Sequence, residues 1–347
     1  NFTQRVNLYS MKILYAFQKT GNGHIARAQE IIPILQKIGT VDLLTSGNQS
    51  QLDIPFKINY NFNGISLVYN KKGKVSYLKT LLQNNYWKFF KNVFQLHVNS
   101  YDIIINDFEP VSAWASKLKG GNCISLSHQA SLLFENTPKP KKTDLISRLI
   151  LKLYAPCKIK YGFHFKSYHP NLFPPVIRGK IKQLKPQSSE GNFVVYLPAF
   201  SDEKIIKTLS KIPVNWHIFS RYTSTEFYVN NCSVNPINEE DFLFKLNHCE
   251  GVLCHAGFEL PAETLYLNKK LLVIPIKKQL EQEYNALALK KLGVLTLEKL
   301  DTNLIDLWTR SQILIDLEVA KDLEEILKSL IEKHCISTTP MQNYQLA

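Results

Sequence analysis

The stretch from Gly251 to Gly293 holds the polar residues whose types and spacing are best suited to chemistry. Gly257 lies in a turn after a short apolar run, where the absence of a side chain lets a ligand approach the backbone closely. The free N–H groups of the following helix would point at the same place, which favours a phosphate. Glu263, in that helix, can accept hydrogen bonds from two neighbouring hydroxyls, and Glu281 with Gln282 can do the same for a sugar. The stretch therefore suits a sugar joined to a nucleotide diphosphate.

Short elements must position these side chains. The apolar runs 251–254 and 271–274 read as buried strands. Between them, residues 260–267 read as a helix with Pro261 in its first turn, and a second helix starts at Glu281. This alternation of strands and helices predicts a parallel sheet whose ligand lies beyond the carboxyl ends of the strands.

The same stretch resembles the donor-binding segment of the two-domain GT-B glycosyltransferases. The residues that carry the resemblance are a His-x-Gly turn, a Glu eight residues after the His, a Pro closing the next strand, and then Glu-Gln and Asn-Ala. The segment is similar to that of family 1 nucleotide-sugar glucosyl- and glucuronosyltransferases, and to family 28, which includes the lipid-linked N-acetylglucosaminyltransferase of peptidoglycan synthesis. In these families the matching Glu holds the nucleotide ribose, and the acidic-Gln pair holds the donor sugar. The resemblance implies a donor site made of His255, Gly257, Phe258, Glu259, Glu263, Glu281, Gln282 and Asn285.

Two positions depart from the pattern of these families. Glu259 stands where many relatives carry a small or amide residue near the pyrophosphate, and Asn268-Lys269-Lys270 replaces the usual Gly-x-Pro. The carboxylate of Glu259 would oppose a phosphate. Lys269 or Lys270 would offset that charge.

The first glycine turn of the chain follows a second candidate strand. The apolar run 12–17 is followed by Gly21-Asn22-Gly23-His24 and a helix over 25–38. As a dinucleotide fingerprint this turn fails, because the third glycine is missing and no acidic residue follows a plausible second strand at the expected distance. It resembles the Gly-x-Gly-His loop of GT-B amino-terminal domains, which implies that Gly21 and Gly23 lie on the acceptor side and that His24 is a catalytic base. A helix-capping role for His24 is the alternative.

Further polar side chains follow two later strands of the first half. Asp107 and Glu109 come directly after the strand 101–105, and His128 follows the strand 122–126. Asp107 can orient His24 and raise its basicity, as the partner of a general base does. Glu109 and His128 are expected to line the acceptor side of the cleft. Helix capping is the alternative for Asp107 and His128.

Charge is unevenly distributed along the chain. Residues 1–190 hold 26 Lys and Arg against 9 Asp and Glu, whereas residues 191–347 hold 16 against 20. This asymmetry predicts an anionic partner for the first half. Aromatic residues among the lysines near Trp87 and Phe94 favour a membrane surface or a lipid-phosphate acceptor over nucleic acid, which is not expected. The alternatives are an ordinary solvated basic surface and, for the aromatic residues, a place in the core.

Length and cysteine usage bound the class of protein. A chain of 347 residues predicts two domains. We expect an amino-terminal domain over 11–168, a linker over 169–191, a donor-binding domain over 192–315, and a helix over 316–335 that returns to the first domain. Residues 1–10 precede a Met that reads as a natural start, so they are set aside. Six scattered cysteines, no secretory leader and no apolar run of membrane-spanning length predict a cytoplasmic protein, peripheral at most on the inner face of the membrane.

The resemblance implies an α/β protein of the GT-B fold, with two doubly wound Rossmann-like domains facing a cleft. The expected activity is an inverting hexosyl transfer from a nucleotide diphosphate sugar, with UDP favoured, to a hydroxyl of a sugar or a lipid-linked cell-envelope acceptor. No cofactor or metal is expected, since no Asp-x-Asp motif follows a strand and helix N–H groups can stabilise the diphosphate. The alternatives are a nucleotide-sugar epimerase and a non-catalytic sugar-nucleotide-binding protein on the same fold.

Overall fold

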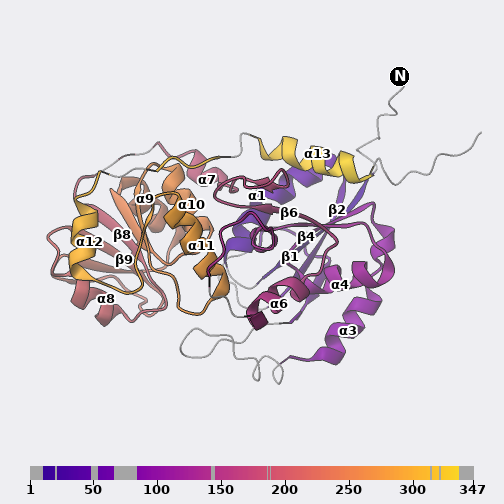
Figure 1. Cartoon of the computed structure of the whole chain (residues 1–347), viewed down its shortest axis with the longest axis horizontal. Helices are drawn as coiled ribbons and strands as arrows, with labels where there is room; N and C mark the ends of the chain where they lie inside the picture. Colours follow the sequence, from indigo (N-terminus) through magenta and orange to yellow (C-terminus); the bar gives the residue numbers. More distant parts are fainter. Residues whose placement is uncertain are drawn as a thin grey trace, which may run out of the picture.

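The computed structural model describes residues 11–19, 22–47, 54–65, 84–141, 145–185, 187, 189–312, 315–319 and 322–335. Figure 1 shows two α/β halves side by side, each with helices packed around a central sheet. The strands are short and almost entirely buried, as expected for parallel sheets covered by helices on both faces. The predicted α/β class with two doubly wound sheets is confirmed.

The first half is built on a seven-stranded sheet in the order β3-β2-β1-β4-β5-β6-β7, and its strand pairs are parallel. Its strands are β1 (Lys12–Gln18), β2 (Thr40–Ser46), β3 (Tyr60–Phe62), β4 (Ile103–Asp107), β5 (Cys123–Leu126), β6 (Ile159–Phe163) and β7 (Leu172–Phe173). Its helices are α1 (Asn22–Ile38), α3 (Tyr86–Gln95), α4 (Pro110–Lys119), α5 (His128–Ser131) and α6 (Leu145–Tyr154). The order of strands reverses between β1 and β4, so a crevice for ligands is expected beyond their carboxyl ends.

The second half has a sheet of the same size, in the order β10-β11-β9-β8-β12-β13-β14. Its strands are β8 (Asn192–Tyr196), β9 (Asn215–Ser220), β10 (Phe227–Val229), β11 (Cys232–Pro236), β12 (Gly251–Cys254), β13 (Lys270–Val273) and β14 (Leu295–Thr296). Its helices are α8 (Asp202–Leu209), α9 (Glu239–His248), α10 (Glu259–Tyr266), α11 (Leu280–Lys291) and α12 (Thr302–Thr309). Only the short edge strand β10 pairs antiparallel among the described pairs of this sheet. The reversal of strand order falls between β8 and β12, the strand that precedes His255.

The chain crosses between the halves twice. The stretch after β6 adds β7 to the first sheet and then forms the short helix α7 (Gly179–Lys182), so residues 169–191 are more than a connection. After the second sheet, helix α13 (Leu323–Cys335) lies against α1 of the first half (Figure 1). Its His334 contributes Nε2 to a 2.9 Å hydrogen bond with the Tyr161 hydroxyl.

Buried apolar side chains form one cluster that continues from the first half into the second. Phe165 follows β6, and Phe258 precedes α10; their ring centres lie 4.8 Å apart. The two halves therefore share a packed apolar contact at the level of the strand ends. None of the described helices is both long and apolar enough to cross a membrane.

Candidate active site

His24 and Asp107 meet beyond the ends of the neighbouring strands β1 and β4. The register of the sheet pairs Phe17 with Asp107, and the turn after β1 brings His24 back over that position. The Nδ1 atom of His24 lies 3.0 Å from Oδ1 of Asp107, and both side chains are buried. An ionised carboxylate only accepts hydrogen bonds, so Nδ1 carries the proton and Nε2 keeps the lone pair of the neutral ring. The pair has the geometry of a general base with an orienting carboxylate.

Arg27, which the sequence analysis did not single out, completes this cluster. It lies one helical turn after His24 on α1, and its guanidinium donates to both oxygens of Asp107, at 2.8 and 2.9 Å. Burial alone would raise the pKa of Asp107, but the charge of Arg27 and then that of His24 outweigh it and lower the pKa to about 2. Asp107 therefore stays ionised throughout the cellular pH range.

The same guanidinium reaches across to the second half of the chain. Nη1 of Arg27 donates to Oε1 of Glu259 at 2.7 Å, at the first residue of α10. Gly23 lies against this carboxylate, since a Cβ there would stand 2.4 Å from Oε2 of Glu259. A larger residue at position 23 would require the Glu259 carboxylate to move. Gly21, the other predicted glycine of this turn, lies outside the described residues.

The turn before α10 is organised by His255. Its Nδ1 lies 2.6 Å from the Ile274 carbonyl oxygen, to which it donates, and its Nε2 accepts from the Ala199 N–H at 3.2 Å. Burial lowers the pKa of His255, which favours the neutral ring that these two contacts require. Both ring nitrogens are thus engaged with backbone groups that follow β8 and β13. Beside Gly257, by contrast, the space that a Cβ would enter is open, so a ligand has room at the start of α10.

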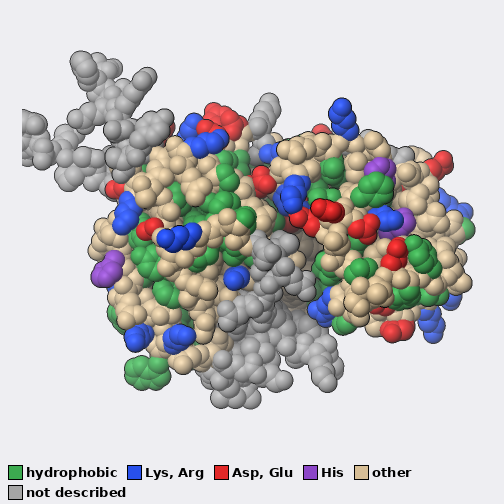
Figure 2. Space-filling model, turned by 180° about the vertical axis from the view of Figure 1, so that it is seen from behind, with side chains coloured by type: hydrophobic (Ala, Val, Ile, Leu, Met, Phe, Trp, Pro, Cys, Tyr) green, Lys and Arg blue, Asp and Glu red, His purple; other side chains and the backbone are tan. Residues whose placement is uncertain are grey.

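Glu263, predicted to hold the ribose, forms a two-pronged ion pair with Arg178. The guanidinium donates through Nε at 2.5 Å and through Nη2 at 2.8 Å, and the Glu263 side chain is buried. Arg178 precedes α7 in the crossing segment, and its Nη1 also contacts Glu239 at 3.1 Å. Acidic and basic side chains lie together along the seam between the halves in Figure 2. A ribose at Glu263 would have to share this carboxylate with Arg178.

The start of α11 faces the first half through polar contacts. Asn285 Oδ1 lies 2.7 Å from His128 Nε2, and Gln129 donates to Glu281 at 3.1 Å. Gln282 accepts through Oε1 from the Ile276 N–H at 2.9 Å, which holds the loop that follows β13. The acidic-Gln pair is therefore placed at the junction of the halves.

His128 and Phe258 form the aromatic part of the same junction. Their rings stack with centres 3.7 Å apart and planes 9° apart, and both are buried. His128 also contacts the Phe163 carbonyl through Nδ1 at 3.0 Å. Burial lowers the pKa of His128 despite the raising effect of Glu281. His128 and Phe258 thus join the two halves in the described structure.

Glu109 differs from the other predicted acceptor-side residues. Its carboxylate caps α4, accepting from the backbone N–H of Val111 at 2.8 Å and of Ser112 at 2.6 Å. The side chain is fully buried, and a contact with acceptor would require this cap to open. Glu109 is therefore a helix cap and is not part of the proposed site. Among the described residues, no group of three or more His, Cys, Asp and Glu is arranged to hold a metal ion.

Sequence reasoning missed Arg27 and Arg178. A signal for Arg27 existed, because residues three apart share one face of a helix, and Arg27 follows His24 by three. Arg178 gave no such signal, since it lies in the segment that read as a linker.

Two doubly wound sheets that pack against each other, with polar side chains at the strand ends of both, are the arrangement of the GT-B fold of glycosyltransferases. The model of glycosyl transferase family 1 matches residues 11–310. The chain therefore belongs to glycosyl transferase family 1, and the protein is a glycosyltransferase. No curated protein matches it in sequence.

Solved structures agree with the fold. The glycosyltransferase SnogD from Streptomyces nogalater is 14% identical, with a TM-score of 0.52 over 92% of this chain and 99% of that chain. MurG from Acinetobacter baumannii is 13% identical, with a TM-score of 0.50 over 93% and 99% of the two chains. A UDP-glucosyltransferase from Polygonum tinctorium is 12% identical, with a TM-score of 0.59 over 96% and 94%. At these identities the likeness concerns the fold.

Proposed function

We propose that this glycosyltransferase moves a hexose from a UDP sugar to an acceptor hydroxyl with inversion. The observation that carries the proposal is the cluster of His24, Asp107 and Arg27, which stands against the start of α10. His24 Nε2 takes the proton of the acceptor hydroxyl as its oxygen attacks the sugar. Asp107 holds the tautomer and favours the imidazolium that forms.

The departing diphosphate is assigned to the second half. N–H groups at the start of α10 and the open space beside Gly257 suit a phosphate. The carboxylate of Glu259 pairs with Arg27 at 2.7 Å, at the start of the same helix. We therefore propose that the diphosphate displaces Glu259 from Arg27, whose charge then stabilises the leaving group. Substrate binding and the pairing of the two halves would be coupled through this exchange.

The remaining donor contacts follow the predicted pattern. Glu281 and Gln282 would bind the sugar, and Glu263 the ribose, with Arg178 beside it to orient the carboxylate. His255 shapes the turn rather than contacting the donor through its ring nitrogens. Helix N–H groups and Arg27 would carry the charge of the diphosphate, so the proposal requires no metal.

We also propose a lipid-linked acceptor and docking of the first half on the inner face of a membrane. On α3, Phe89 is buried in the core, whereas Trp87 is 90% exposed and Phe94 64% exposed. Helix α3 packs on α4, and Trp114 of α4 donates to the Leu153 carbonyl of α6 at 3.1 Å. Helices α3 and α6 therefore both contact α4, and both lie along the lower edge of the first half in Figure 1.

The function is tested by a donor screen followed by a transfer assay. Nucleotide sugars that bind should raise the melting temperature, and the panel should include UDP, GDP and TDP sugars. The best donor is then incubated with membrane extract, using wild-type protein and His24→Ala. Donor-dependent labelling of an acceptor by the wild type alone is expected. If free donor is interconverted without acceptor, the protein is an epimerase; if no nucleotide sugar binds, the proposal fails.

A further inference from the structure

A cavity of about 880 Å³ opens between α6, the segment after α5 and the end of the first sheet. Tyr284 of α11 also lines it, so the cavity borders the second half at the helix that begins with Glu281 and Gln282. Its lining carries five cationic side chains and one carboxylate, Glu135. The cations are Lys139, Arg148, Lys152, Lys158 and Lys160.

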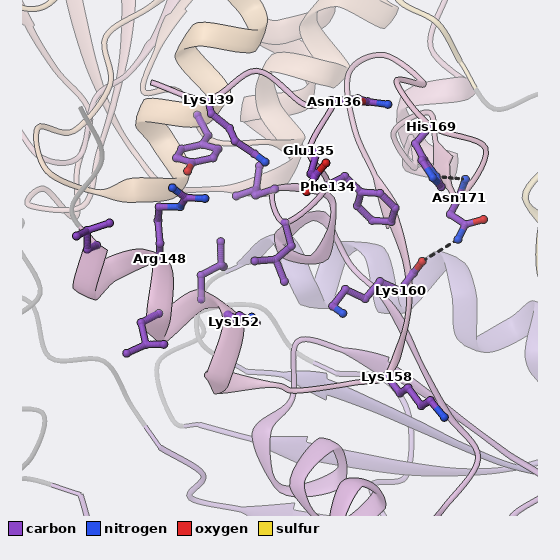
Figure 3. A pocket seen from close by; sticks show the side chains of 16 residues that line it. Phe134, Glu135, Asn136, Lys139, Arg148, Lys152, Lys158, Lys160, His169 and Asn171 are labelled. Atoms are coloured by element: carbon purple, nitrogen blue, oxygen red, sulfur yellow. Dashed lines mark hydrogen bonds between the residues drawn. The ribbon is translucent and has the colours of Figure 1, made fainter. Parts of the chain in front are cut away.

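These five cations outnumber the single carboxylate of the lining, Glu135. Figure 3 shows Lys139, Arg148, Lys152 and Lys160 around the cavity, with Lys158 at its outer edge. Within the part of the chain that the structure describes, none of the five forms an ion pair. Burial and the nearby charge of Arg148 both lower the pKa of Lys139, with Glu135 opposing. Several like charges around one space favour a multiply charged anion between them.

The same cavity has an apolar border. Leu145 and Leu149 of α6 line it and are 77% and 54% exposed. Arg148 and Lys152 lie on the same helix, so cationic and apolar side chains alternate along one short element. Exposed leucines next to a basic cavity suit a molecule with an alkyl chain attached to its anionic group.

We propose that this cavity binds the phosphate of an amphiphilic acceptor, with the alkyl chain lying along α6. A phosphate ester accepts hydrogen bonds from Arg148 and from lysine ammonium groups, and Arg matches it with two parallel donors. Tyr284 of the donor half lines the cavity, so the head of the same molecule lies on the side of the junction of α5 and α11. The identification of this ligand as an acceptor rests on the proposed transferase function; the binding itself does not.

Binding is measured by calorimetry with decyl phosphate below its micelle-forming concentration, in the absence of donor. Arg148→Gln/Lys152→Gln should weaken binding by about tenfold or more, because two charge-assisted contacts are lost. Both residues are exposed, so the variant should fold. The matched control is Lys207→Gln/Lys211→Gln, which removes the same charge from exposed positions in and just after α8 and should leave affinity unchanged. Equal weakening in the control, or no binding to wild type, would overturn the proposal.

Two further measurements distinguish an amphiphilic phosphate ester from free phosphate as the ligand. Inorganic phosphate should bind much more weakly than decyl phosphate, and Leu145→Ser/Leu149→Ser should weaken decyl phosphate alone. If inorganic phosphate binds as tightly as decyl phosphate, the site binds a free anion, and the proposal of an amphiphilic ligand is refuted. Because donor is absent, a wild-type protein that binds nucleotide sugars but no decyl phosphate refutes the cavity proposal alone. The reverse result refutes the transferase proposal.

Discussion

Arg27 is the residue on which the contacts of the candidate site converge. It pairs with Asp107 in the same half and with Glu259 in the other, and it lies 3.2 Å from Nδ1 of His24. Its own side chain is almost fully buried. A single guanidinium thus neutralises the carboxylate that orients the proposed base and also contacts the start of α10.

His24→Ala should lower kcat by about 10²–10⁴-fold, because the enzyme loses the base that takes the proton from the hydroxyl of the acceptor substrate. Donor affinity should stay unchanged, since the donor contacts are assigned to the second half. Steady-state kinetics and donor titration measure the two quantities. A folded His24→Ala protein with near-wild-type kcat would move the role of base to Asp107 or His128.

Arg27→Gln should destabilise the protein by about 3–5 kcal/mol, because it leaves the buried charge of Asp107 without its guanidinium partner. Asp107→Asn should cost a similar amount, by leaving Arg27 unpaired on that side. The double variant Arg27→Gln/Asp107→Asn should be more stable than the sum of the single losses predicts. Urea unfolding measures all three; simple addition of the two losses would show that the pair is not coupled.

Glu259→Gln should tighten donor binding by about tenfold, because it removes the carboxylate that competes with the diphosphate for Arg27. The change keeps the shape of the side chain beside Gly23. Calorimetric titration with the best donor and with free UDP should show the gain for both ligands. Weaker binding of both would mean that Glu259 supports the donor site instead of blocking it.

At the scale of the elements, strand ends bring together groups that lie far apart in sequence. Adjacency of β1 and β4 explains why the proposed pairing of His24 with Asp107 could be made from sequence: apolar runs mark the strands, and parallel order aligns their ends. The contact of Arg27 with Glu259 could not be inferred, because it depends on how closely α10 approaches α1. Glu109 shows the opposite case, since a carboxylate after a strand can equally cap the next helix.

Burial at the end of β6 gives a pH dependence of stability. His164 follows that strand, and burial, reinforced by the charge of His128, lowers its pKa to about 3. The unfolded chain, with a histidine pKa near 6.5, binds more protons below that pH than the folded chain does, so stability should fall as pH drops below about 6.5. By pH 5 this one group should cost about 2 kcal/mol.

His164→Asn, which retains an acceptor for the Lys166 N–H, should flatten this pH dependence. Urea unfolding at pH 7 and pH 5 gives the slope for wild type and variant. His97→Asn, a change at an exposed histidine, is the control and should leave the slope as it is. Equal slopes for all three proteins would contradict the assignment to His164.

At the scale of the whole molecule, the fold class follows from the sequence more securely than the details do. Alternating apolar runs and helices predict parallel sheets, the resemblance to GT-B glycosyltransferases implies two doubly wound ones, and the structure confirms both. The edge strand β10 and the helix α12 were not predicted, because elements of three and eight residues are too short to show a clear periodicity. Strand β7 lies in the stretch that read as a linker, since its two residues are flanked by prolines and polar residues.

The basic first half and its exposed aromatic residues predict binding to anionic vesicles. Each lysine close to such a surface contributes on the order of 1 kcal/mol, and salt screens the attraction. The protein should sediment with vesicles containing phosphatidylserine and not with phosphatidylcholine alone, and high salt should release it.

Trp87→Ser/Phe94→Ser should reduce this sedimentation, whereas Tyr222→Ser/Tyr228→Ser, at exposed positions of the second half, should not. Equal binding to both vesicle types would count against an electrostatic membrane contact.

The return of α13 to the first half has a consequence for synthesis on the ribosome. Leu323 is translated only after the entire second sheet, yet the helix it begins lies on α1, near the start of the chain. Until then Ile331 and Leu327, both buried in the finished protein, cannot cover their partners in the first half. The apolar surface of the first half that α13 covers therefore stays exposed while the second half is being synthesised. Nascent chains that stop before Leu323 should be the ones that chaperones bind and proteases remove.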